Sequence, residues 1–183
     1  MTTTDETKPN IEERYSSAIN TSNLRVEADK GGSADLLIAV GWSASRLGAA
    51  LMRLHTEYDS AAVPPGAVSD TDCYLLQWKL KSLPDVLEQV TIYATVRGIE
   101  RPQAVALAVV AFWLDKHCQR CSGHKFERIP GTPSLSAKHC KACRGTGEIP
   151  FPHGSAGKLI ERYLDEAVER AQASIKKRLL AMY

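Results

Sequence analysis

The sequence predicts a mainly α-helical protein that carries an inserted four-cysteine module and ends in a C-terminal helix. Apolar residues recur at helical spacing along most of the chain, and no strand-rich region is found apart from short hairpins in the cysteine-rich stretch. Two CxxC pairs interrupt the helical pattern. We expect a flexible N-terminal segment over residues 1–33 and a helical domain over 34–183, with the cysteine module inserted at about 116–153.

The cysteine module has the spacing of a structural zinc site. Cys118 and Cys121 form the first pair, Cys140 and Cys143 form the second, and 18 residues separate the pairs. A CxxC turn lets two thiolates reach one tetrahedral ion, and two such turns complete a closed site with Zn–S distances of about 2.3 Å. A glycine follows each pair two residues later, where a positive φ lets the chain fold back. We predict one zinc ion per chain, held by these four thiolates in a zinc ribbon or knuckle.

Other roles for the thiols are open at the level of the sequence. The cysteines could form disulfides, or one of the neighbouring histidines (His117, His124 or His139) could replace a cysteine ligand. A catalytic zinc ion keeps one position open for water and has an acid or base nearby. Glu127 and Glu148 are the only carboxylates in 116–153, and neither belongs to an HxE or HExxH motif. Because the chain also lacks a nucleophile–base pair and a phosphate-binding glycine loop, we do not expect an enzyme.

The segment before the module is expected to begin with one helix. Asp35 can cap a helix whose apolar positions run from Leu36 to Leu54. Within it, residues 41–48 (GWSASRLG) either join two helices in a helix-turn-helix or supply small residues at a tight crossing within a single helix. Small residues in helices serve packing more often than DNA contact, so we favour the single helix. A proline-rich loop is expected over 58–72, and apolar periodicity resumes over 73–80.

Two further helices lead into the module. Ser82 is expected to cap the first, with Asp85 at the capping-box position and Pro84 in the first turn. Pro102 opens the second, which is apolar on almost every side and runs directly into the first cysteine pair. Helices over 84–97 and 102–117 could form another helix-turn-helix. The second helix is too apolar to meet base edges in a major groove, so we expect a core hairpin. After the module, Ser155 is expected to cap the last helix.

Positive charge is concentrated in the last third of the chain. Residues 1–115 carry ten basic and fifteen acidic side chains, whereas residues 116–183 carry thirteen basic and six acidic ones. Concentrated positive charge on one element is typical of phosphate contact, so we expect binding to double-stranded DNA. The candidate contacts lie in the cysteine module: Arg120, Lys125, Arg128, Lys138, Lys141 and Arg144.

The sequence also favours a reducing, cytosolic location. The fifth cysteine, Cys73, has no partner outside the metal cluster. The N-terminus is polar and lacks the apolar core of a secretory signal, and the longest apolar run, over 104–114, is too short to span a bilayer.

The order of these segments resembles the lambda-type bacteriophage late-gene antitermination protein Q. An alanine- and glycine-rich stretch (ADLLIAVGWSASRLGAALMRL) precedes an apolar helix that runs into CxxCxG, a linker and CxxCxGxG. The similarity extends from about Asp35 to Phe151 and is most specific from Ala104 to Glu148. We call each CxxC turn with the glycine that follows it a knuckle. The first knuckle, which contains Cys118 and Cys121, has Lys125 where a repeat of CxxCxGxG would have its second glycine.

The resemblance implies a phage transcription antitermination factor in the cytoplasm of a bacterial host. Such a factor binds DNA near a late promoter and modifies paused RNA polymerase holoenzyme so that it reads through terminators. The implied partners are promoter DNA, the polymerase β-flap and σ region 4. The resemblance is also compatible with a second protomer of this chain on the DNA. The implied cofactor is structural zinc.

Two alternative functions stay open at this point. CxxCxGxG is also the repeat of the zinc module in J-protein chaperones, although that module has four repeats and this chain has two, without a His-Pro-Asp motif. A zinc-stabilised DNA-binding transcription regulator that does not act on elongation would also share these features.

Overall fold

The structure, a computed structural model, describes residues 10–21, 32–61, 80–129, 132 and 134–181. The chain forms two compact units, one made of Met1–Met52 with Asp165–Tyr183 and the other of Arg53–Leu164. Helices α3 (Arg46–Ser60) and α7 (Gly154–Ala181) each contribute residues to both units. This division differs from the single helical domain that we expected over 34–183.

The unit at the chain ends begins with a helix inside the segment that we expected to be flexible. Helix α1 (Ile11–Ile19) starts with a capping box, in which Asn10 Oδ1 accepts a hydrogen bond and the Glu13 carboxylate accepts from Asn10 N–H at 3.0 Å. Tyr15 and Ala18 are buried against α2 (Ser33–Gly41), with which α1 packs. Residues 11–19 therefore form a helix within the segment 1–33 that we expected to be flexible.

The break at 41–48 separates two helices, so the expectation of a single helix over this region is wrong. Helix α2 ends at Gly41 and α3 begins at Arg46. The packing role of the small residues is nevertheless found in the structure. A Cβ added at Gly48 would lie 2.0 Å from the carbonyl oxygen of Ala167 in α7. Ser45 Oγ donates to the same carbonyl at 3.0 Å. The first turn of α3 thus packs closely against α7 around Ala167.

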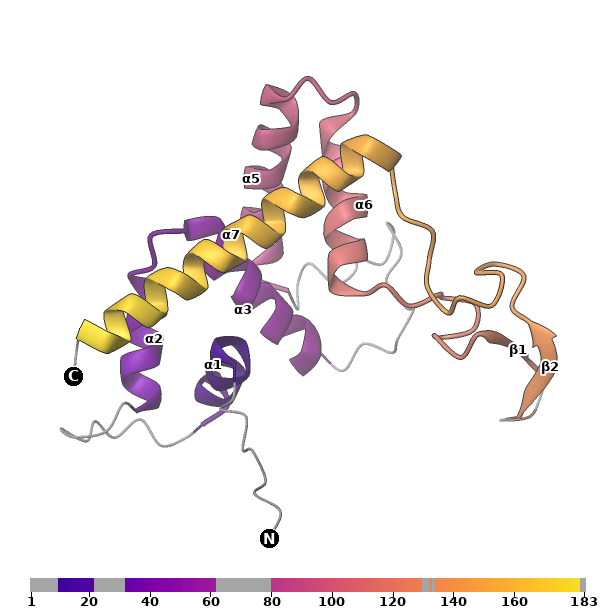
Figure 1. Cartoon of the computed structure of the whole chain (residues 1–183), viewed down its shortest axis with the longest axis horizontal. Helices are drawn as coiled ribbons and strands as arrows, with labels where there is room; N and C mark the ends of the chain where they lie inside the picture. The colour runs from indigo at the N-terminus through magenta and orange to yellow at the C-terminus, as the bar shows by residue number, and fades with distance from the viewer. Residues whose placement is uncertain (1–9, 22–31, 62–79, 130–131, 133, 182–183) are drawn as a thin grey trace, which may run out of the picture. The chain divides into compact units, whose positions relative to one another are not determined.

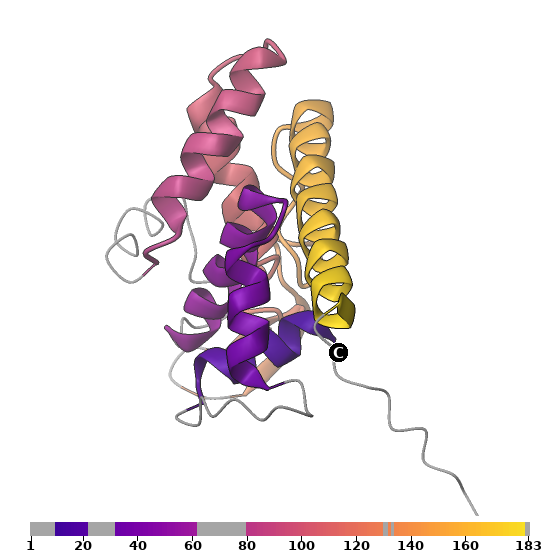
Figure 2. The same cartoon turned by 90° about the vertical axis from the view of Figure 1, so that its left-hand side faces the viewer.

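The other unit contains the core hairpin that the sequence predicts. Helices α5 (Leu83–Val96) and α6 (Pro102–Leu114) lie side by side, joined by a short turn in which Gly98 has φ +68° (Figures 1 and 2). Val86, Val90 and Ala94 of α5 are fully buried. Eight of the thirteen residues of α6 are buried as well, which explains its nearly uniform apolar composition.

The start of α5 is held differently from the expected capping box. Ser82 occupies the N-cap position but makes no side-chain cap bond to its own helix. Instead, its Oγ and N–H both donate to the carboxylate of Glu57 in α3, each at 2.9 Å. Helix α3 continues to Ser60, so residues 58–60 are helical rather than part of the expected loop. Most of that loop, together with Cys73 and the segment up to 79, lies outside the described residues.

The remaining elements complete a mainly helical fold. The described residues contain six helices and one antiparallel hairpin of β1 (Phe126–Arg128) and β2 (Leu135–His139), whose register is irregular. Figure 1 shows the two strands side by side. Helix α7 is a 28-residue C-terminal helix that begins at Gly154, so Ser155 lies within its first turn. The predicted fold class is confirmed. Within the described ranges, none of the helices combines the length and apolar character needed to cross a bilayer.

Candidate metal centre

The four predicted cysteine ligands come together at the base of the β1–β2 hairpin. The Sγ atoms of Cys118, Cys121, Cys140 and Cys143 all lie within 4.8 Å of one another, and all four residues are buried. The Cys118–Cys140 pair has an Sγ–Sγ distance of 3.9 Å, and the Cys121–Cys143 pair has one of 3.8 Å.

These distances fit a tetrahedral metal ion. Four sulfur atoms at about 2.3 Å from a central ion stand about 3.8 Å apart, since the edge of a tetrahedron is about 1.6 times the centre-to-corner distance. A disulfide requires about 2.05 Å, and all four cysteines are free. This group of four possible ligands consists of cysteines and includes none of the three neighbouring histidines. A tetrahedral four-thiolate site suits zinc or iron.

Each CxxC turn is closed by contact between a histidine and a glycine. A Cβ added at Gly123 would lie 2.6 Å from Cδ2 of His117, the residue just before the first pair. A Cβ added at Gly145 would lie 2.7 Å from Nδ1 of His139, the residue just before the second pair. Both glycines also have positive φ, at +81° and +86°. Glycine suits these positions through its conformation, and a Cβ at either one would have to displace the histidine ring.

The two knuckles are hydrogen-bonded to each other in a reciprocal pattern. Cys118 N–H donates to the Gly147 carbonyl at 2.8 Å, and Cys140 N–H donates to the Lys125 carbonyl at 2.9 Å. Lys125 and Gly147 also donate their own N–H groups to the sulfur atoms of Cys121 and Cys143, respectively. Both have positive φ, at +70° and +84°. Lys125 thus holds the left-handed conformation of the glycine that it replaces in the repeat.

These backbone donors lower the pKa values of the Cys121 and Cys143 thiols to different extents. Burial raises the pKa of the Cys121 thiol to about 11, although the Lys125 N–H opposes it. Burial by itself also raises the pKa of the Cys143 thiol, but the N–H groups of Gly147 and Gly145 outweigh it and bring this pKa to about 6. A thiolate that accepts backbone N–H bonds is ready to bind a metal ion at neutral pH.

A buried carboxylate joins the module to the end of α6. Asp115 is 7% exposed. Its Oδ1 accepts from His117 N–H at 2.8 Å and lies 2.7 Å from His117 Nδ1, while Tyr58 Oη donates to Oδ2 at 3.2 Å. The sequence carries no signal for this network, because Tyr58 lies 57 residues before Asp115 and no local pattern links them.

The two chain segments that connect the module to the helices also pair with each other. Ile149 N–H donates to the Lys116 carbonyl at 2.9 Å. The Lys116 ammonium lies 3.7 Å from the Glu161 carboxylate and 5.3 Å from the centre of the Phe112 ring. Phe112 in turn meets Phe151 edge-to-face at 4.9 Å. The module is thus attached through two chain segments joined by an isolated antiparallel β-bridge and through an aromatic contact, rather than through a single flexible linker.

The six candidate DNA contacts are all exposed and lie across both knuckles and the hairpin. None forms an ion pair with another described residue. By contrast, Lys116 forms an ion pair with Glu161. The six residues divide between the knuckles and the two strands as follows: Arg120, Lys125, Lys141 and Arg144 in the knuckles, with Arg128 in β1 and Lys138 in β2.

Comparison of the chain with models of known protein families, with curated proteins and with solved structures finds no match.

Proposed function

We propose that the chain binds one structural Zn²⁺ through Cys118, Cys121, Cys140 and Cys143. The sulfur–sulfur distances of 3.8 and 3.9 Å support a tetrahedral ion, and the closed four-thiolate set leaves no position for a substrate or catalytic water. The ion would fix the two knuckles and hence the positions of the basic side chains that they carry.

We further propose that the loaded module binds double-stranded DNA through its phosphates. The observation that carries this proposal is the set of six exposed basic side chains without ion-pair partners among the described residues. Glu127 and Glu148 are the only acids between 116 and 153. A cation that is already paired gains little from a phosphate, whereas an unpaired one releases a counterion from the DNA when it binds.

The resemblance to the lambda-type Q family extends this proposal to transcription antitermination. The factor would act in the cytoplasm of a bacterial host, on a DNA site near a late promoter. It would contact paused RNA polymerase at the same time, through the β-flap and σ region 4. Binding DNA and polymerase together raises the effective concentration of each for the other, so modest individual affinities suffice.

Both alternative functions are compatible with a zinc module, and the structure bears on one of them. A J-protein module holds two metal clusters, whereas the described residues contain one cluster of four cysteines. A DNA-binding regulator that does not act on elongation would use the same basic side chains.

Transcription in vitro separates the two transcription roles. The template carries the promoter region that adjoins the chain's own gene, followed by a downstream terminator. We expect readthrough to rise when the zinc-loaded protein is added and to stay at its basal level with the Cys140→Ser variant. Unchanged readthrough, with binding to that DNA confirmed, would reject antitermination in favour of a regulator of initiation.

A further inference from the structure

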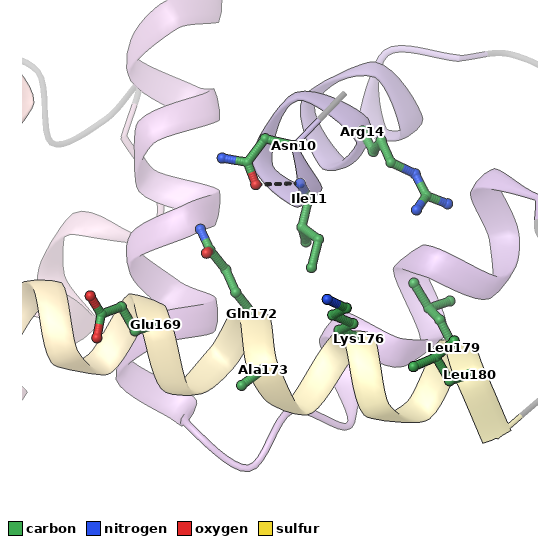
Figure 3. Close-up of a pocket in the computed structure, with 9 residues that line it drawn as sticks. All are labelled: Asn10, Ile11, Arg14, Glu169, Gln172, Ala173, Lys176, Leu179 and Leu180. Atoms are coloured by element: carbon green, nitrogen blue, oxygen red, sulfur yellow. Dashed lines mark hydrogen bonds between the residues drawn. The ribbon is translucent and has the colours of Figure 1, made fainter. Parts of the chain in front are cut away.

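A pocket of about 730 Å³ lies between α1 and the last turns of α7, in the unit formed by the two chain ends (Figure 3). It belongs to neither the metal cluster nor the candidate DNA contacts. The apolar part of its lining includes Ile11 from α1 with Leu179 and Leu180 from α7. Leu180 is 73% exposed, so this end of the pocket presents apolar surface to solvent. Ile11 and Leu179 are half-buried, so the concave lining and its rim together offer apolar surface that a ligand would cover.

The charges of the pocket are arranged with opposite signs at its two ends. Arg14 and Lys176 lie toward the apolar end, and Glu169 lies one helical turn or more away along α7 (Figure 3). None of the three forms an ion pair with another described residue. The side-chain amides of Asn10 and Gln172 complete the lining and can exchange hydrogen bonds with a polar backbone.

From this arrangement we propose that the pocket binds a short peptide segment of a partner protein, with an acidic residue next to a bulky apolar one. The apolar side chain would pack on Ile11, Leu179 and Leu180. The acidic side chain would reach Lys176 and Arg14. Peptide N–H groups or a basic side chain of the partner would face Glu169.

The same features argue against other anions. A nucleic acid would bring phosphates along the whole pocket and would meet the Glu169 carboxylate. A simple fatty acid would satisfy the cations and the apolar surface but would make no use of the Glu169 carboxylate or of the two side-chain amides. A peptide supplies an anion, an apolar group and hydrogen-bond donors together. The proposal is independent of the proposed function, because its residues belong to neither the metal cluster nor the candidate DNA contacts.

Selection from a random library of 12-residue peptides on the zinc-loaded full chain tests the proposal. We expect the enriched peptides to carry Asp or Glu within a few positions of Leu, Ile or Phe. Lys176→Glu should weaken their binding by about tenfold or more, since it turns an attraction into a repulsion. Leu180→Ser should weaken it too, and because this side chain is exposed, the variant should fold normally. Lys177→Glu is the matched control: it makes the same charge change on the next residue, outside the pocket lining, and should alter affinity by less than about twofold.

Several outcomes would overturn the proposal. Equal effects of Lys176→Glu and Lys177→Glu, no enrichment over the blank, or enriched peptides without an acidic residue would each do so. Loss of DNA affinity with Lys176→Glu but not with Lys177→Glu would assign the pocket to nucleic acid. Self-association in a sedimentation experiment, abolished by Lys176→Glu alone, would assign it to a second copy of this chain.

Discussion

Replacing Lys125 separates the conformational role of this residue from its charge. A non-glycine residue in the left-handed region costs about 1–2 kcal/mol, and Lys125 holds φ +70° at the position where the second knuckle has Gly147. Lys125→Gly removes this cost, but glycine loses about 0.5–1 kcal/mol more backbone entropy on folding. We expect a net stabilisation of the zinc-loaded module of about 0.5–1 kcal/mol. Lys125→Ala removes the same charge while keeping the strain, so it should leave stability unchanged.

Competition with a zinc chelator measures this difference, because metal binding and folding of such a module are coupled. Lys125→Gly should retain zinc about twofold to fivefold more tightly than Lys125→Ala. If the Lys125 ammonium contacts a phosphate, both variants should also lower the slope of log affinity for DNA against log salt by about 0.9. Equal zinc retention by the two variants would refute the argument from strain. A salt slope unchanged in both would remove Lys125 from the DNA contacts.

Three further predictions address packing, metal ligation and proton linkage. Gly48→Ala should lower the free energy of unfolding in urea by about 1–2 kcal/mol although alanine has the better helix propensity, because the new Cβ would meet the backbone of α7 at 2.0 Å. The control Gly41→Ala places its Cβ in open space and should not lower this free energy. Equal effects of the two substitutions would contradict the packing of α7 on Gly48. Cys140→Ser should lose most of its zinc by metal analysis while keeping much of its helical circular dichroism, and full zinc content would exclude this ligand. Zinc affinity should rise with pH between about 6 and 11, because metal binding must displace the proton of Cys121 (pKa about 11), whereas Cys143 (pKa about 6) is already ionised. Proton release when zinc is added at pH 7.5 in weak buffer checks this prediction. The absence of proton release would contradict it.

The cysteine cluster could be predicted from the sequence because its geometry is local. Two ligands in one CxxC turn are placed by the turn itself, and the glycine that follows closes it. The attachment of the module could not be predicted in the same way. Asp115 is a buried carboxylate whose partner Tyr58 lies far away in the sequence, in another helix. Glu57 similarly replaces the expected capping box at Ser82, because a carboxylate from α3 reaches both donors of that residue.

The region before α3 shows how tertiary packing decides between two local interpretations. The stretch 41–48 is compatible with one helix or two, and the approach of Ala167 from α7 to Gly48 is not visible in the sequence. Helix α1 is a different case. Asn10 and Glu13 have the spacing of a capping box, so the signal was present. The polar, acidic composition of the surrounding segment nevertheless favoured the prediction of a flexible N-terminus over that of a helix.

The central claim is that the zinc module, rather than positive charge in general, binds DNA phosphates. Two triple variants test it with the same loss of charge. The module variant combines Lys138→Ala, Lys141→Ala and Arg144→Ala, three exposed residues at or next to the second knuckle. The helix variant replaces three exposed basic residues near the end of α7 by alanine: Lys176, Lys177 and Arg178.

The deciding measurement is the affinity of both variants for duplex DNA as a function of salt, with zinc content confirmed in each. If all three module residues contact phosphates, the module variant should lose about 2.7 from the slope of log affinity against log salt and should bind all sequences more weakly. The helix variant should keep the parent slope. A module variant that binds like the parent at every salt concentration, or a helix variant that loses the slope instead, would contradict the assignment of DNA binding to the zinc module.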